Sequence, residues 1–152
     1  MLREKLNLWS SHHYVVTNML KAETVLRVRY SETDRMGYAY YGNYAQYYEV
    51  GRVEALRKAG FSYKEMEDKG ILLPVVDFAI QYKKPAYYDD EITVVTTIKE
   101  LPSVRFTFHY ECFNAQKELL NTGHVTLVFI DREKNRPCPP PEWFLDEMKK
   151  YF

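Results

Sequence analysis

The sequence has little cysteine, no surplus of charge of either sign and no long apolar run. Its 152 residues include only two cysteines, Cys112 and Cys138, and neither lies in a CxxC pair. This argues against a disulfide framework and a zinc site, and it favours a reducing, cytoplasmic compartment. The chain balances 21 Lys and Arg against 21 Asp and Glu, whereas a generic nucleic-acid-binding protein needs a basic surplus. No apolar stretch is long enough to predict a transmembrane helix.

Two signatures of other protein classes are missing as well. The chain has no G-x-S-x-G elbow with a Ser-His-Asp set, which excludes an α/β-hydrolase mechanism. It has no glycine-rich phosphate loop either. Tyrosine is instead abundant, with 14 copies beside 8 phenylalanines. Because tyrosine combines a large apolar body with a polar tip, it suits strands, interfaces and pockets.

The length fits one domain, preceded by a segment of different character. A chain of 152 residues can bury enough surface to fold without a disulfide or metal. Residues 1–20 are expected to form a peripheral N-terminal extension, since polar residues interrupt any apolar core of a secretory signal. An alternative is that Met19 is the natural start. Residues 21–152 are expected to form the folded domain.

Hydrophobic periodicity predicts one strand, one long helix and then four strands. The helix is expected from Asn43, a residue type that caps helices, to a stop at Gly60. Tyr44 and Val50 are expected on its apolar side, and Arg52 nearer water. The predicted strands span residues 24–31, 72–83, 91–100, 104–113 and 118–131, and a short helix spans 142–151.

This order of elements predicts an α+β fold. Short connections between the last four strands make them antiparallel neighbours, and the sheet is the available cover for the apolar helix. We therefore expect a long antiparallel sheet of about five strands wrapped around one central helix. Such a sheet leaves an exposed edge, and residues 125–130 are apolar on both faces, so we expect a homo-oligomer.

Residues 32–60 resemble a known family. Their sequence, ETDRMGYAYYGNYAQYYEVGRVEALRKAG, is similar to the signature of the hotdog-fold acyl-CoA thioesterases, in the branch typified by 4-hydroxybenzoyl-CoA thioesterase. The later YKKPAYYDDEI resembles the family's segment between its second and third strands. The positions that match the pattern are Asp34, Gly37, Tyr41, Asn43, Tyr44, Glu49 and Arg52.

The resemblance implies a hotdog fold, hydrolysis of an acyl- or aroyl-CoA thioester, and a dimer or a tetramer made of two dimers. It implies no metal and no redox cofactor, since coenzyme A is part of the substrate. Many members of a neighbouring bacterial branch have His where this chain has Tyr41, and the aromatic residue matches the aroyl-CoA type. This difference argues against a mechanism that relies on an imidazole there.

The chemistry of thioester hydrolysis points to the catalytic candidates. A carboxylate must attack the carbonyl or deprotonate a water molecule, and Asp34 lies in a loop that enters the helix. The free backbone N–H groups of Tyr41 and Gly42, at the positive end of the helix dipole, can bind the developing oxyanion. Alternatively, Asp34 is a turn-forming residue and nothing more.

Substrate binding is expected from a tyrosine-rich segment and from scattered cations. The tyrosines either line an acyl pocket or pack against the sheet and a partner subunit. Glu49 is a second acid–base group, a residue on the helix surface, or the ion-pair partner of Arg52, one helical turn away. The cations either bind the phosphates of coenzyme A or are solvated surface charges. The candidates are Tyr38, Tyr40, Asn43, Tyr44, Glu49, Lys83, Arg105 and Arg132.

Three alternatives compete with hydrolysis of an acyl-CoA. The protein can be a non-catalytic acyl-binding member of the same fold, or a thioesterase that acts on acyl-carrier-protein. Hydro-lyase chemistry on the same thioesters needs a histidine near a helix carboxylate, and no histidine lies between His13 and His109.

Overall fold

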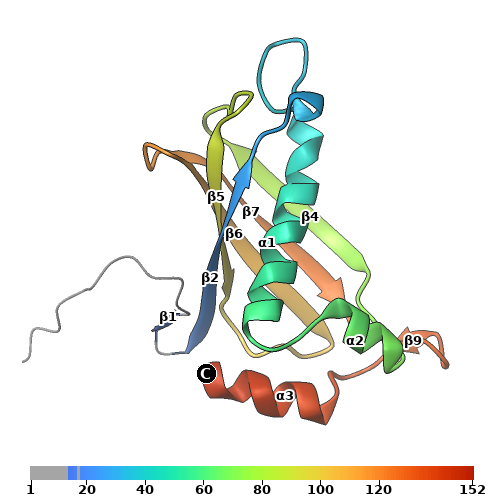
Figure 1. The fold of residues 1–152 in the computed structure, drawn as a ribbon. Coiled ribbons are helices and arrows are strands. Elements are labelled where there is room, and N and C mark those ends of the chain that lie inside the picture. Colours follow the sequence, from blue (N-terminus) through green and yellow to red (C-terminus); the bar gives the residue numbers. More distant parts are fainter. Residues whose placement is uncertain (1–13, 17) are drawn as a thin grey trace, which may run out of the picture.

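The protein is described by a computed structural model that covers residues 14–16 and 18–152 (Figure 1). Most of the extension predicted for residues 1–20 lies outside this range. The predicted boundary after residue 20 is nevertheless wrong. Strand β2 (Met19–Arg27) already begins at Met19, and Leu20 is only 1% exposed in the core. Strand β1 (Tyr14–Val16) pairs with it, so the sheet starts before the predicted domain boundary.

One antiparallel sheet forms the body of the protein. Its spatial order is β1-β2-β5-β6-β7-β4. Strand β4, which comes after the long helix in the chain, therefore lies at the opposite edge from β1 and next to β7. Five of the six strands are long, which confirms the prediction of about five. The remaining long strands are β4 (Val75–Tyr82), β5 (Glu91–Ile98), β6 (Arg105–Asn114) and β7 (Leu119–Val128).

A second, smaller sheet was not predicted. The two long strands expected over residues 72–83 and 118–131 are each interrupted, the first at Pro74, which has no N–H to donate. At these interruptions the backbone forms hydrogen bonds outside the regular strand ladders: Val128 N donates to Pro74 O, and Phe129 N donates to Val104 O. The short strands β3 (Ile71–Leu72), β8 (Ile130–Asp131) and β9 (Arg136–Pro137) form this sheet.

The long helix α1 (Tyr44–Lys58) lies across the inner face of the main sheet (Figure 1). This is the predicted hotdog arrangement of one central helix wrapped by a sheet. The helix approaches the sheet closely at Gly51, where a Cβ atom would lie 2.7 Å from Thr96 Oγ1 and 2.9 Å from Val94 Cγ1. Two further helices, α2 (Tyr63–Asp68) and α3 (Glu142–Met148), lie near the C-terminal end of α1.

The helix corrects two sequence predictions. Val50 is exposed, whereas Arg52 is buried at 7% exposure. Arg52 lies four residues after Tyr48, and residues at this spacing share one face of a helix. Its guanidinium lies beside the phenols of Tyr63 and Tyr110. The predicted ion pair with Glu49 does not form among the described residues, so helical position outweighed the charge of the side chain.

The three-residue 3₁₀ turns η1 (Tyr30–Glu32) and η2 (Tyr41–Asn43) bracket the loop that precedes α1, and a third, η3 (Lys149–Tyr151), continues α3. No helix within the described part of the chain is long and apolar enough to cross a bilayer.

Strand β4 forms one edge of the main sheet. It pairs with β7 alone, so one side of its backbone has no strand partner in a single chain. Its apolar side chains are also poorly covered, because α1 lies mainly over β2 and β5. Val75, Val76, Phe78 and Tyr82 are all exposed. An open edge with exposed apolar residues is a surface that proteins normally cover.

Candidate active site

Asp34 lies in a tight loop stabilised by its own hydrogen bonds. Its Oδ1 accepts from Met36 N at 2.8 Å, and its backbone O accepts from Gly37 N at 3.0 Å. Gly37 has a φ of +88°, which glycine adopts without strain. The second carboxylate oxygen accepts no hydrogen bond from the residues that the structure describes. Asp34 is therefore a turn-forming residue that also keeps a free basic oxygen.

The backbone amides of Tyr41 and Gly42 lie where η2 leads into α1. They are the first two N–H groups of that turn, and neither donates to a backbone carbonyl of the described residues. Asn43 occupies the N-cap position, but its side chain does not cap the helix. Its amide donates instead to Glu32 O at 2.6 Å. The first N–H groups and the positive end of the helix dipole thus remain available to an oxyanion.

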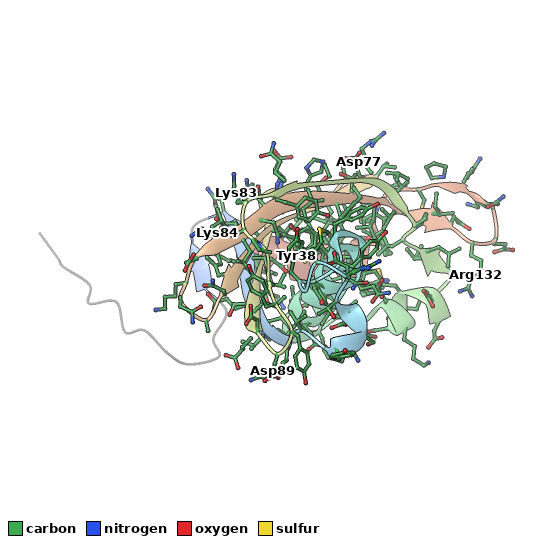
Figure 2. The ribbon with its side chains drawn as sticks, turned by 90° about the horizontal axis from the view of Figure 1, so that it is seen from above. Tyr38, Asp77, Lys83, Lys84, Asp89 and Arg132 are labelled. Carbon is green, nitrogen blue, oxygen red and sulfur yellow. The ribbon has the colours of Figure 1, made fainter. Side chains whose placement is uncertain are left out.

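A cavity of about 240 Å³ joins the Asp34 loop to the end of β4. It brings together five of the predicted site residues, Asp34, Tyr38, Tyr41, Tyr44 and Lys83. Its remaining walls come from Met36, Ala39, Tyr82, Lys84 and Pro85. Figure 2 shows Tyr38 in the middle of the molecule, with Lys83 and Lys84 close together on one side of it.

Aromatic rings form the walls of this cavity. Tyr82 makes edge contacts with Tyr41 and Tyr44, with ring centroids 6.4 and 5.7 Å apart. Its hydroxyl donates to Tyr41 O at 2.8 Å, which fastens the end of β4 to the turn before α1. Burial, together with the nearby thiol and phenols, raises the pKa of Tyr44, so its hydroxyl stays neutral. The cavity therefore has an apolar, uncharged wall beside one carboxylate.

The predicted catalytic residue Gly42, the predicted binding residue Asn43 and several other predicted binding residues do not line the cavity. Tyr40 is exposed, with its ring against that of Tyr41, and Glu49 is exposed on α1. Arg105 is the first residue of β6, whereas the cavity lies near the opposite ends of the strands. Figure 2 shows Arg132 on the far side of the molecule from Lys83 and Lys84. A single chain thus keeps both arginines away from Asp34.

The sequence interpretation missed Tyr82 and Pro85 as neighbours of Asp34, and it named Lys84 only as one of several cations that could bind the phosphates of coenzyme A. The segment that contains them carried part of the family resemblance, so a signal existed. Its position beside the Asp34 loop depends on strand β4 lying next to β7, which local patterns do not specify.

The chemistry available here is that of an acyl-transfer site. A carboxylate with a free oxygen can attack a carbonyl or activate water, and free amides at a helix start can stabilise the resulting negative charge. Lys83 and Lys84 both line the cavity, but Lys84 is ion-paired with Glu118, so Lys83 is the side chain there whose positive charge suits a phosphate-bearing ligand.

Comparison with known proteins identifies the family of the chain. The family model of the Thioesterase-like superfamily matches residues 28–148, and the chain belongs to this family. The resemblance inferred from residues 32–60 is thereby confirmed, and the protein is a thioester hydrolase.

Named relatives are similar over most of their length. A putative acyl-CoA thioesterase, YneP of Bacillus subtilis, is 38% identical over 112 residues, which is 74% of this chain and 81% of that protein. The acyl-CoA thioester hydrolase YbgC of Escherichia coli is 30% identical over 82% of this chain and 93% of its own length. A DHNA-CoA thioesterase structure from Staphylococcus aureus superimposes with a TM-score of 0.80, at 37% identity, covering 86% of this chain and 88% of that one.

Proposed function

We propose that the protein hydrolyses an acyl- or aroyl-CoA thioester to the free acid and coenzyme A. The observation that carries this proposal is the cavity at which the free carboxylate oxygen of Asp34 and the start of α1 meet. Relatives and a similar structure are named as thioesterases of acyl-CoA and of DHNA-CoA, and these names support the same substrate class.

Asp34 acts as general base or as nucleophile in this proposal. As a base, its free oxygen takes a proton from water while the water oxygen attacks the thioester carbon. The carbonyl oxygen becomes an oxyanion and accepts hydrogen bonds from the Tyr41 and Gly42 amides. Collapse of this intermediate breaks the carbon–sulfur bond, and the departing thiolate takes up the proton. As a nucleophile, Asp34 forms an acyl anhydride and expels the thiolate, which takes a proton from solvent. Water then hydrolyses the anhydride, which releases the acid and restores the Asp34 carboxylate.

The two halves of the substrate are assigned to different walls. The acyl group lies against the rings of Tyr38, Tyr44 and Tyr82, where aromatic surface replaces water. Phosphates of the coenzyme A part lie near Lys83. The reaction transfers the acyl group to water, so the proposal needs no metal and no redox cofactor.

The test is thiol release from a panel of aliphatic and aromatic acyl-CoAs, with matched acyl-carrier-protein thioesters in parallel. We expect turnover of at least one acyl-CoA at a kcat/KM above its carrier-protein counterpart. If only the carrier-protein thioesters were hydrolysed, the substrate would be an acyl-carrier-protein and not an acyl-CoA. Binding of acyl-CoA with no turnover on the whole panel would contradict the hydrolytic proposal.

We also infer that two chains associate through β4. Antiparallel pairing of two β4 edges would satisfy their free backbone groups and cover Val76, Phe78 and Tyr82. The same pairing would bring the far end of the partner chain, with the partner's Arg132, toward the Lys83 side of the cavity. This arrangement is a route by which the distant arginines can serve a site, and two such dimers can form a tetramer.

Light scattering at micromolar concentration tests this association. We expect a mass of twice or four times the 18.2 kDa of one chain. Val76→Lys should lower that mass, because pairing would bury the added charge. Val25→Lys is the matched control, since Val25 on β2 is similarly exposed, at 57% against 53% for Val76. A wild-type mass near 18 kDa, or equal effects of the two variants, would contradict pairing through β4.

The cellular compartment remains a prediction from the cysteines. Both Cys112 and Cys138 are free thiols, and burial raises the pKa of the Cys112 thiol to about 12. Unpaired, unreactive cysteines suit the reducing cytoplasm.

A further inference from the structure

Glu32 is a buried carboxylate two residues before Asp34. It ends the η1 turn, and its side chain is 8% exposed. Within residues 18–152 it is the only acidic residue that is buried, and all the others are at least partly exposed. Burying a carboxylate is unfavourable unless hydrogen bonds replace the lost water. The partners of Glu32 therefore indicate why the loop contains it.

The carboxylate joins Arg29, which lies between β2 and η1, to the central helix. Its Oε1 accepts from the backbone N–H of Arg29 at 2.8 Å and from the hydroxyl of Tyr47 at 3.2 Å. Its Oε2 accepts from Nε and Nη2 of Arg29 at 3.2 and 3.0 Å. Tyr47 is buried on α1, so this side chain connects the Asp34 loop to the body of the helix.

The backbone carbonyl of Glu32 joins the same loop to the turn that precedes α1. It accepts from Tyr40 N at 2.9 Å and from Asn43 Nδ2 at 2.6 Å. Tyr40 and Asn43 flank Tyr41 and Gly42, whose amides are the assigned oxyanion donors. Glu32 is thus hydrogen-bonded to the residue before and to the residue after this pair of amides, and it lies two residues from Asp34.

We propose that Glu32 is a positioning residue of the active site, which holds the Asp34 loop against the start of α1. This rests on the proposed roles of Asp34 and of the two amides. The carboxylate and the amides come from different segments, and the reaction needs both at fixed places around one thioester carbon. Glu32 links these segments through its side chain and its backbone, without touching the substrate.

The charge on Glu32 is part of this link. Burial by itself would raise the pKa of Glu32, but the hydrogen bonds from Arg29 and Tyr47 and the charge of Arg29 lower it overall. The carboxylate therefore stays ionised and accepts from all of its donors. In Glu32→Gln, one acceptor oxygen becomes an NH₂ group. Whichever way the amide is turned, that group faces an N–H of Arg29.

Steady-state kinetics of Glu32→Gln test the proposal. We expect kcat to fall by about 10²-fold, the size of loss that a misplacement of roughly 1 Å can cause. KM should change little, because the acyl and coenzyme A walls are untouched. A purely structural role would instead lower the unfolding temperature and the active fraction, and leave kcat per folded active site unchanged. An unchanged kcat would overturn the proposal.

A double-mutant cycle with Asp34→Asn identifies the group through which Glu32 acts. If Glu32 positions Asp34, Glu32→Gln should cause no further loss of the residual rate once Asp34 is replaced. A loss of equal size in both backgrounds would overturn the proposal. The Asp34→Asn single variant separates the two assignments. If it keeps wild-type turnover, the catalytic role of Asp34 fails first. If it is slow while Glu32→Gln is normal, only the positioning role fails.

Tyr47→Phe and Glu91→Gln complete the design. Tyr47→Phe removes one hydrogen bond to Glu32 but keeps the buried ring, so it decides the question if Glu32→Gln does not fold. We expect a smaller fall in kcat, again absent in the Asp34→Asn background, and no fall would overturn the proposal. Glu91 is the matched control, because it pairs with Arg27 on the adjacent strands but is exposed. Glu91→Gln should leave kcat and the unfolding temperature unchanged.

Discussion

Replacing Asp34 by Asn is expected to lower kcat by about 10²–10⁴-fold, the usual contribution of one acid–base group. Asn keeps the shape of the side chain, and its oxygen can still accept the hydrogen bond from Met36 N that closes the turn. The change therefore removes the negative charge and the free basic oxygen while keeping the loop. Thiol release at saturating substrate measures the effect, and thermal unfolding should show little change in stability.

Asp89→Asn is the matched control for this experiment. Asp89 lies in another loop on the surface (Figure 2), and its carboxylate is exposed and pairs with Arg27. The control should keep wild-type turnover. If Asp34→Asn retains more than half of the wild-type kcat on the best substrate, Asp34 is not the catalytic carboxylate.

Tyr41→Pro is expected to lower kcat by about 10²–10³-fold, the usual cost of one lost oxyanion donor. Proline deletes the backbone N–H that the proposed mechanism uses. The local backbone suits it, because Tyr40 already has a ψ of 132°, in the range required of a residue before proline. Position 41 also begins a helical turn, where proline is tolerated. Circular dichroism and the oligomeric mass should match those of the wild type.

Tyr41→Phe and Tyr41→Ala separate the N–H from the side chain. Tyr41 is 62% exposed, and the hydrogen bond that fastens the residue to Tyr82 uses the backbone oxygen of Tyr41. Tyr41→Phe should therefore keep kcat within a few-fold of wild type, and Tyr41→Ala should stay far above Tyr41→Pro. A loss in Tyr41→Phe comparable to that in Asp34→Asn would show that the phenol donates a proton or hydrogen bond, and it would overturn the backbone assignment.

Much of this fold follows from local patterns. The helix over residues 43–59 differs from α1 by one residue at each end, because its periodicity and the following Gly60 are both local. The alternation over residues 91–100 and 104–113 likewise predicts β5 and β6 closely. The small sheet was missed, because pairing between β3 and β8 depends on where two distant segments meet.

The candidate site divides in the same way. Asp34, Gly37, Tyr41 and Gly42 are close in sequence, so a turn followed by a helix start predicts their placement. Their catalytic role was predicted only with the family resemblance, and it stays a prediction. Arg105 and Arg132 were predicted from their charge and their place at predicted strand ends, and the sheet places them far from the cavity of their own chain.

The sequence by itself therefore determined the long helix, the strands β5 and β6, the family and the Asp34–Gly42 segment, since each depends on neighbouring residues. The tertiary structure alone decided that Tyr82 and Lys84 line the same cavity as Asp34, that Arg52 is buried and that Glu32 joins the loop to α1. Those contacts link residues from separate elements. These contacts depend on the order of the strands and on the position of the helix on the sheet. The packing of the whole core determines that order and that position.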